Sequence, residues 1–411
     1  MSVTVSPYPT ISETTVKAPR VVSIDIFRGL TMAVMIFVNA LSGVNGLPWW
    51  TYHAHDSMNA MTYVDMVFPF FLFIVGMSLP LSITQRLRRN PSQPALWAHV
   101  VVRSLGLVVL GLILANAEFC DPARMPMNGY LWALLALLSA ALYLNVYEKP
   151  KRFLQSPRIL RAVGLIGVVV MFACFRRSTP SGHGAWIDFA YPEILGLIGL
   201  TYLGAAILVI LTRRWRWAPA GWFVLMTAIN ILSKARIATV FDRLSLYIWP
   251  FGDGAMVSVV MAGVLTSSIY LGIEPKYSVK RAMSIAAGFA LIALASGTVL
   301  IPLGISKNRG TPTWCLYSIG ASVLSFTLLY WLCDVKKWTR WAFFVRSAGA
   351  NTLTTYLLPD FWIILLGVLG VTFYDTHFSY GGSGVMKTFA FTFLMLGISW
   401  AVTKAKVRLQ F

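Results

Sequence analysis

The residues best suited to chemistry lie in one short polar segment, YHAHDSMNAMTYVD, between two long apolar runs. An imidazole takes up and releases a proton near neutral pH, so His55 is a candidate general base. A carboxylate that accepts from one imidazole nitrogen makes the other nitrogen more basic, and we expect Asp65 to orient His55 in this way. Asp56 and Asn59 are expected to contact a substrate. The alternative is a histidine hydrogen-bonded at the lipid headgroups, beside an Asp65 favoured by the helix dipole.

Other polar side chains in or beside apolar runs could bind a substrate or stabilise a transition state. Asn39 lies near the end of the first run, where its amide could donate to a carbonyl, although membrane asparagines more commonly bond between helices. The basic segment with Lys307 and Asn308 could hold an acidic or sugar substrate, or could simply be solvated. Polar groups within a membrane segment need a partner or a function. The remaining substrate-binding candidates are Trp50, which could stack on a sugar, Asn351 and Asp360.

Asp25 and Arg28 lie at the start of the first apolar run. Their spacing puts them on one face of a helix, where they can pair. Such a pair could fix the position of the helix, or it could take part in binding an anionic cofactor.

Membrane-spanning helices must position these residues. Of the 411 residues, 57% are hydrophobic and only 12% are charged, whereas a soluble domain has about 25% charged residues. Since each span needs roughly 20 mostly apolar residues, we predict an all-α, polytopic transmembrane helical bundle of 12 spans, or 11 if the short segment 217–234 does not cross. The predicted spans are 22–41, 64–84, 98–116, 129–147, 159–176, 190–212, 217–234, 254–273, 281–302, 313–333, 346–372 and 385–404.

The distribution of basic residues predicts the orientation. Cytoplasmic loops are rich in Lys and Arg, and with twelve spans only nine of the 34 Lys and Arg fall in the outer set of loops. Both termini are therefore predicted to be cytoplasmic, with residues 1–20 as a tail and the His55 loop outside. No linker divides the remainder, so residues 21–411 are expected to form a single transmembrane domain. Pro359 is expected to kink or break the long span 346–372.

Several functional classes lack support in the sequence. The net charge of +19 does not indicate nucleic-acid binding, because the basic residues occupy short loops and form no stripe or arm. The four cysteines have no CxxC spacing typical of a metal site, although a Cys120–Cys174 disulfide is possible. No P-loop, HExxH or GxSxG motif is present. A 12-helix secondary transporter for a small solute remains an alternative to an enzyme, but its polar site would be expected near the midplane of the membrane.

The stretches SIDIFRGLTMAVMIFVN and HDSMNAMTYVDMVFPFFLFIVG are followed much later by GISKNRGTPTWCLYS, LLYWLCDVKKWTRWAFF and GANTLTTYL. Together they resemble the catalytic domain of the heparan-α-glucosaminide N-acetyltransferase family. The resemblance covers the first two predicted spans and the chain from about residue 250 onward, whereas the region 120–250 matches poorly.

This resemblance implies that an acetyl group moves from cytosolic acetyl-CoA to an amino sugar or glycan on the outer side of the membrane. The active-site histidine of the family falls on His55, and its functional asparagine falls on Asn39. His55 would then be a base or a transient acetyl carrier, Asp65 would orient it, and Asn39 would bond a carbonyl or developing oxyanion. Groups on the inner side would bind acetyl-CoA, and the candidates are Arg28, Asp25, Arg88 and Arg103.

The resemblance further implies a multi-pass protein of the inner (cytoplasmic) membrane, embedded in the lipid bilayer, with a possible homodimer and no metal. O-acetylation of a glycan would keep the same mechanism with a different acceptor.

Overall fold

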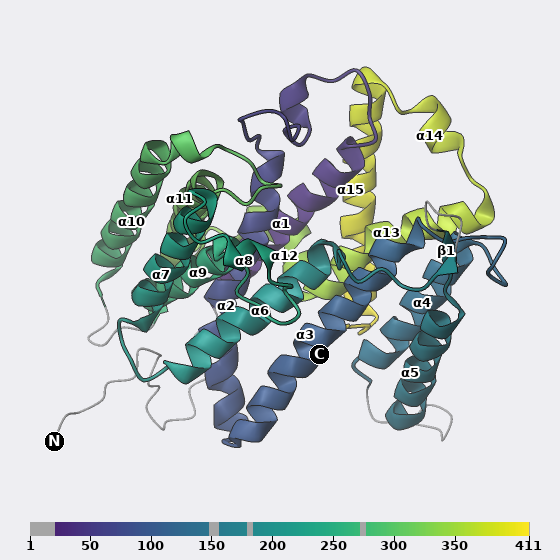
Figure 1. Ribbon diagram of the computed structural model, residues 1–411, viewed down its shortest axis with the longest axis horizontal. Helices are drawn as coiled ribbons and strands as arrows, with labels where there is room; N and C mark the ends of the chain where they lie inside the picture. The colour runs from purple at the N-terminus through teal and green to yellow at the C-terminus, as the bar shows by residue number, and fades with distance from the viewer. Residues whose placement is uncertain (1–20, 148–155, 179–183, 272–276, 411) are drawn as a thin grey trace. The chain divides into compact units, whose positions relative to one another are not determined.

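Helices make up nearly all of the regular structure in the computed structural model, which describes residues 21–147, 156–178, 184–271 and 277–410 (Figure 1). Within these ranges, nine helices are long and apolar enough to cross a membrane. Two shorter apolar helices are α4 (Gly129–Leu144) and α9 (Ala255–Leu271). An all-α, polytopic membrane protein is therefore confirmed, whereas the number of spans and their orientation stay predictions. The predicted tail, 1–20, lies outside the described residues.

The remaining elements follow in chain order. The other long helices are α1 (Val22–Leu41), α2 (Val67–Arg89), α3 (Gln93–Ala117), α5 (Pro157–Cys174), α6 (Glu193–Leu211), α7 (Ala218–Lys234), α10 (Val279–Val299), α11 (Pro312–Tyr330), α13 (Thr352–Leu369) and α15 (Gly381–Lys404). Short helices are α8 (Val240–Arg243), α12 (Phe343–Ala350) and α14 (Phe373–His377). Strands β1 (Arg177–Ser178) and β2 (Gly184–Ala185) pair antiparallel. A π-helical turn, η5 (Trp331–Val335), continues α11.

Each predicted span contains a helix. A kink or a break was expected at Pro359; the break is wrong, and the kink stays a prediction. The helix α13 runs through Pro359 to Leu369. The interruption lies at Asn351, where φ is −123° and ψ is 56°, so α12 and α13 are separate helices. A proline removes a single backbone donor, and a membrane helix tolerates that loss among neighbouring helices. The non-helical backbone of Asn351 instead interrupts the helix itself.

Contacts between residues divide the chain into two units that alternate along the sequence. The first unit comprises Met1–Thr31, Pro48–Val101 and Leu200–Phe343. The second unit comprises Met32–Leu47, Val102–Gly199 and Phe344–Phe411. Each unit therefore combines segments that are far apart in the sequence, and each is described by itself below.

In the first unit, α2 packs tightly against α9, and glycines allow the backbones to approach. A methyl group on Gly76 would collide with the carbonyl oxygen of Val260, and one on Gly263 would collide with the carbonyl oxygen of Phe73. Close approach through small residues is typical of packed membrane helices. Beside this pair, α7 packs on α9 and α10 packs on α11 (Figure 1).

In the second unit, α4 and α5 form an antiparallel pair (Figure 1). The buried Trp132 of α4 donates its indole N–H to the carbonyl oxygen of Met171 at 2.7 Å and packs on the ring of Phe175. The outer face of α5 is apolar and exposed, at Val163, Leu165, Ile166, Val169 and Val170. An apolar surface of this kind is expected where a spanning helix faces lipid.

Candidate functional site

The polar segment between α1 and α2 is held by short turns in the first unit. Trp49–Thr51 forms a 3₁₀ turn (η1) after Pro48, and the Thr51 hydroxyl donates to the Pro48 carbonyl oxygen at 2.7 Å. A second turn follows, in which the Met58 N–H donates to the carbonyl oxygen of His55 at 2.8 Å. A further 3₁₀ turn, η2 (Val64–Met66), leads directly into α2. These turns bring the middle of the segment back over the start of α2.

Asp65 organises this segment although it is only 1% exposed. One carboxylate oxygen, Oδ2, accepts from the Thr62 N–H at 2.9 Å, from the Ala54 N–H at 3.2 Å and from the Thr62 hydroxyl at 3.3 Å. The other oxygen, Oδ1, lies 2.7 Å from Nδ1 of His53. The buried Trp314 of α11 donates its indole N–H to the Asp65 carbonyl oxygen at 3.1 Å. A buried carboxylate requires such partners, and both carboxylate oxygens of Asp65 have them.

The expected pairing of Asp65 with His55 is therefore wrong, because the partner of Asp65 is His53. The His53 side chain is 45% exposed while Asp65 is buried, so the pair joins the interior to the surface. The spacing of these residues in the sequence fits either histidine. The turn at His55 decides between them, because it places Nδ1 of that imidazole against Ser57 instead.

His55 itself is exposed and is held locally by Ser57. Its Nδ1 lies 2.9 Å from the Ser57 hydroxyl and also accepts the Ser57 backbone N–H at 3.4 Å. These two contacts fix the ring by one nitrogen. The exposed side chain leaves the other nitrogen, Nε2, accessible to a substrate.

The basic segment around residue 307 lies against the same loop. The Lys307 ammonium is 3.4 Å from each ring nitrogen of His53, and the Asn308 amide donates to the carboxylate of Asp56. Asn59 accepts the backbone N–H of Ile305 through its side-chain oxygen. Four of the predicted site residues, Asp56, Asn59, Lys307 and Asn308, therefore lie in one cluster beside His53. Their role in binding a substrate stays a prediction.

Trp50 belongs to the η1 turn of the same loop and is 53% exposed. Its ring centroid is 6.5 Å from that of Tyr63. Partial burial raises the pKa of the Tyr63 phenol, so this hydroxyl stays protonated at neutral pH. An exposed indole beside a phenol could stack on a sugar ring.

Three other predicted site residues belong to the second unit. Asn39 is exposed near the end of α1. The amide of buried Asn351 donates to the Val407 carbonyl oxygen at 2.9 Å and to the Thr403 hydroxyl at 3.2 Å, and its oxygen accepts from the Thr354 hydroxyl. Asn351 thus ties the C-terminal segment to α13, which is a structural role and gives no support to substrate binding. Asp360 is partly buried in the middle of α13.

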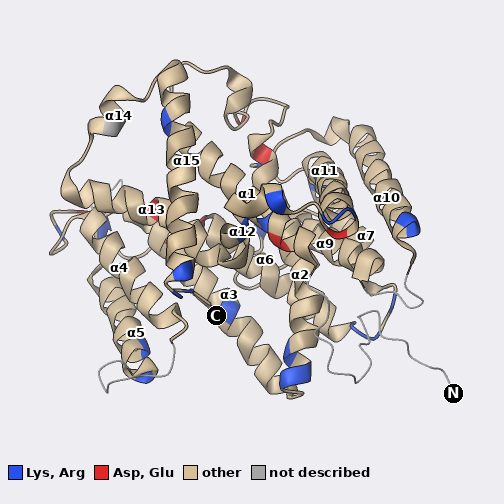
Figure 2. Ribbon diagram, turned by 180° about the vertical axis from the view of Figure 1, so that it is seen from behind, with Lys and Arg blue, Asp and Glu red and all other residues tan. Residues whose placement is uncertain are grey.

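The predicted acetyl-CoA-binding residues are distributed over both units. Asp25 and Arg28 pair at 3.5 Å, as expected, and Arg28 also donates to the Ser78 hydroxyl at 2.7 Å. Arg88 lies in the strongly basic last turn of α2, at the end of the helix opposite Asp65 (Figure 2). Arg103 belongs to α3 in the second unit.

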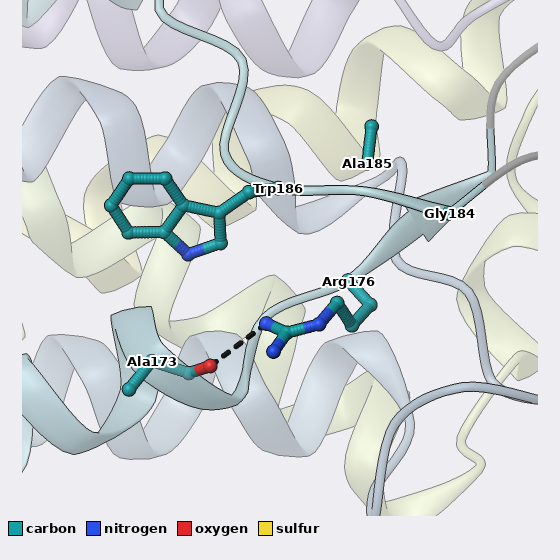
Figure 3. A pocket seen from close by; sticks show the side chains of 5 residues that line it. All are labelled: Ala173, Arg176, Gly184, Ala185 and Trp186. Carbon is teal, nitrogen blue, oxygen red and sulfur yellow. Dashed lines mark hydrogen bonds between the residues drawn. The ribbon is translucent and has the colours of Figure 1, made fainter.

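A surface pocket of about 430 Å³ lies in the second unit and contains none of the predicted site residues. Figure 3 shows Trp186 and Arg176 beside the β1–β2 hairpin, where the guanidinium donates to the Ala173 carbonyl oxygen at 2.8 Å. Across the described residues, no group of three or more His, Cys, Asp and Glu could hold a metal ion.

The possible disulfide is not formed, since Cys120 and Cys174 are both free thiols. Cys120 contacts the sulfur of Met125 instead. Burial raises the pKa of the Cys120 thiol, so this group is a poor nucleophile at neutral pH.

Sequence reasoning overlooked three residues that build the site. His53 was present in the polar segment, but nothing in the local pattern distinguished it from His55. Ser57 and Trp314 were overlooked because a turn hydroxyl and an interfacial tryptophan are common in membrane proteins. The presence of a second histidine before Asp65 was the one signal that could have identified His53.

Comparison with known proteins relates the chain to a transferase. Human (Homo sapiens) heparan-alpha-glucosaminide N-acetyltransferase is 39% identical over 114 residues, which are 26% of this chain and 16% of the human protein. The protein of the same name from Mus musculus is 39% identical over 115 residues, 26% of this chain and 17% of the mouse protein. The matched segment is thus about a sixth of the length of each relative. A domain of unknown function, DUF5009, matches residues 20–255, more than half of the chain, and this protein therefore belongs to the DUF5009 family.

Proposed function

We propose that this protein is a membrane acetyltransferase that moves the acetyl group of acetyl-CoA to an amino sugar or another glycan acceptor. The observation that carries the proposal is the cluster at the start of α2. In a chain similar to an N-acetyltransferase, a loop between two helices long enough to span a membrane holds His53 against the buried carboxylate of Asp65 and carries a second, exposed histidine, His55.

Acyl transfer needs the groups that this loop offers. The acceptor must lose a proton as it attacks the thioester carbon, and an imidazole is the usual side chain for that step. The developing oxyanion needs a hydrogen-bond donor, and such a donor accelerates acyl transfer by roughly 10²–10³-fold in well-studied enzymes. His55 takes part directly in this reaction, and the role of Asn39 as a further donor stays a prediction.

Acetyl-CoA approaches from the cytoplasmic side in this proposal, and the acceptor is on the outer side. The Lys and Arg distribution supports this direction, since the basic last turn of α2 is at the end opposite the loop (Figure 2). Arg28, held by Asp25 and Ser78, and Arg88 would attract the phosphates of CoA. In this proposal the protein resides in the lipid bilayer of the inner membrane and forms a homodimer.

Similarity to a transferase favours this function over a secondary transporter. Consumption of acetyl-CoA distinguishes the two functions. The enzyme converts one acetyl-CoA to free CoA thiol for each acetylated acceptor, whereas a transporter moves its solute without consuming acetyl-CoA.

The test uses purified full-length protein in detergent with radiolabelled acetyl-CoA and a panel of amino sugars. We expect acceptor-dependent release of CoA thiol, and loss of transfer in His55→Ala with an unchanged melting temperature. His377→Ala, at an exposed histidine of α14 in the second unit, is the matched control and should remain active. Wild-type turnover by a well-folded His55→Ala protein would show that His55 has no catalytic role. Failure of the wild-type protein to acetylate any acceptor would contradict the function itself.

A further inference from the structure

In the two histidines of the loop, Nδ1 faces partners of opposite hydrogen-bonding character: an acceptor at His53 and a donor at His55. Nδ1 of His53 faces a carboxylate, which only accepts hydrogen bonds when ionised. Nδ1 of His55 faces a backbone N–H, which only donates. A neutral imidazole carries one proton, so the partner of Nδ1 determines whether Nε2 holds a proton or a lone pair.

We propose that His53 is the general base of the reaction and that His55 is a hydrogen-bond donor to the thioester oxygen. This inference rests on the proposed acetyl transfer and assigns separate roles to two neighbouring histidines. It makes His53 a catalytic residue and Asp65 the residue that positions it.

The state of His53 follows from Asp65. Because Oδ1 of Asp65 is 2.7 Å from Nδ1, the proton lies on Nδ1 and Nε2 has a free lone pair. Asp65 cannot turn away from His53 easily, since its other oxygen accepts three hydrogen bonds from Thr62 and Ala54. The arrangement is that of a histidine base oriented by a buried carboxylate.

Lys307 lies beside the same ring but does not select its tautomer. Its ammonium is 3.4 Å from both Nδ1 and Nε2 of His53, and an ammonium has donors but no acceptor. Because the two distances are equal, the assignment of the proton to Nδ1 rests on the shorter contact with Asp65. Among the described residues, the charged groups with a recorded contact to the His53 ring are Asp65 and Lys307.

The state of His55 follows from Ser57. The Ser57 backbone N–H points to Nδ1 of His55 at 3.4 Å, and the Ser57 hydroxyl lies 2.9 Å from the same atom. Nδ1 therefore accepts, and the proton of the neutral ring lies on Nε2. An exposed N–H of this kind stabilises negative charge on oxygen, but it is not a nucleophile, so direct transfer is favoured over an acetylated His55.

The reaction can then be written in two steps. The neutral amine of the acceptor attacks the thioester carbon; a C–N bond forms, the carbonyl π electrons move to oxygen, and the amine proton passes to Nε2 of His53. His55 donates to the resulting oxyanion from Nε2. When the oxyanion collapses, the C–S bond breaks, and the leaving thiolate takes the proton from the His53 imidazolium. The products are an amide and CoA thiol, with both histidines restored.

Glutamine substitutions test this division of roles, because the glutamine amide can donate a hydrogen bond but cannot act as a base at neutral pH. We expect His53→Gln to lower kcat by roughly 100-fold or more, the usual contribution of a general base. His55→Gln should keep at least about ten times the activity of His55→Ala, the factor expected for one retained donor. His377→Gln is the matched control.

Full activity in a folded His53→Gln protein, or equal loss in His55→Gln and His55→Ala, would overturn the assignment. Modification by diethyl pyrocarbonate, read by mass spectrometry, tests it without any acceptor, since the reagent attacks an unprotonated ring nitrogen. His53 should react faster than His55, and Asp65→Asn should slow His53 only. The reverse order would refute the assignment even in an inactive preparation, whereas absence of turnover with the expected order would contradict only the acetyltransferase function.

Discussion

Replacing Asp65 by asparagine separates the contribution of this residue to catalysis from its contribution to stability. The side chain keeps its size but gains an NH₂ group in place of one oxygen. Oδ2 accepts three hydrogen bonds and Oδ1 accepts one, so the amide oxygen should occupy the Oδ2 position. The NH₂ group then donates to Nδ1 of His53, and the ring proton moves to Nε2. The result is a folded protein whose His53 is in the wrong tautomer.

The two effects differ in size. Hydrogen bonds to a charged group contribute about 1.5–3 kcal/mol and neutral ones about 0.5–1.5 kcal/mol. With most of the bonds to Asp65 kept, we expect the free energy of unfolding to fall by about 1–3 kcal/mol. Loss of the carboxylate that orients a histidine base costs up to about 10⁴-fold in kcat in serine proteases, and we expect a decrease of about 10²–10⁴-fold here. The rate should therefore fall far more than the melting temperature suggests.

Thr62→Val is the matched control. It removes a hydroxyl that is 3.3 Å from Oδ2 of Asp65 and 2.7 Å from the Tyr52 carbonyl oxygen, but it leaves the carboxylate facing His53. It should destabilise the protein to a similar extent and keep kcat within about fivefold, the factor that 1 kcal/mol represents. Acetyl transfer is measured at saturating acetyl-CoA across pH, and the melting temperature is measured in the same detergent. If Asp65→Asn retains the rate and pH profile of the wild type, the carboxylate does not orient a base.

Two further predictions concern the helices that carry the site. Asp334→Ala removes the carboxylate that accepts the first two N–H groups of α1, at 3.0 and 2.9 Å. Loss of such a cap costs about 1–2 kcal/mol, so the melting temperature should fall. An unchanged melting temperature would show that this contact does not stabilise the protein. Gly76→Leu places a side chain against the carbonyl oxygen of Val260 and should prevent α2 and α9 from packing, seen as loss of the monodisperse peak in size-exclusion chromatography, whereas Gly288→Leu, at an open position on α10, should behave as the wild type.

The apolar runs of the sequence predicted the helices well. A run of about 20 apolar residues has few options in a membrane, because its backbone groups must bond within the helix. The same reasoning correctly required a partner for Asp65, since an unpaired carboxylate at the start of a span is costly. A break at Pro359 was a wrong expectation, because proline affects one backbone bond while packing decides whether the helix continues.

The identity of the partner of Asp65 depends on the tertiary structure. His53 and His55 are close in sequence and chemically alike, so spacing does not distinguish them. The turn at His55 directs that ring to Ser57 and leaves His53 facing the carboxylate. Likewise, the sequence showed Lys307 to be basic, but only folding brings it to the His53 ring. The residue types that can do chemistry are therefore determined by the sequence alone, whereas the direction in which each hydrogen bond points, and hence which histidine holds a lone pair, is decided by the fold.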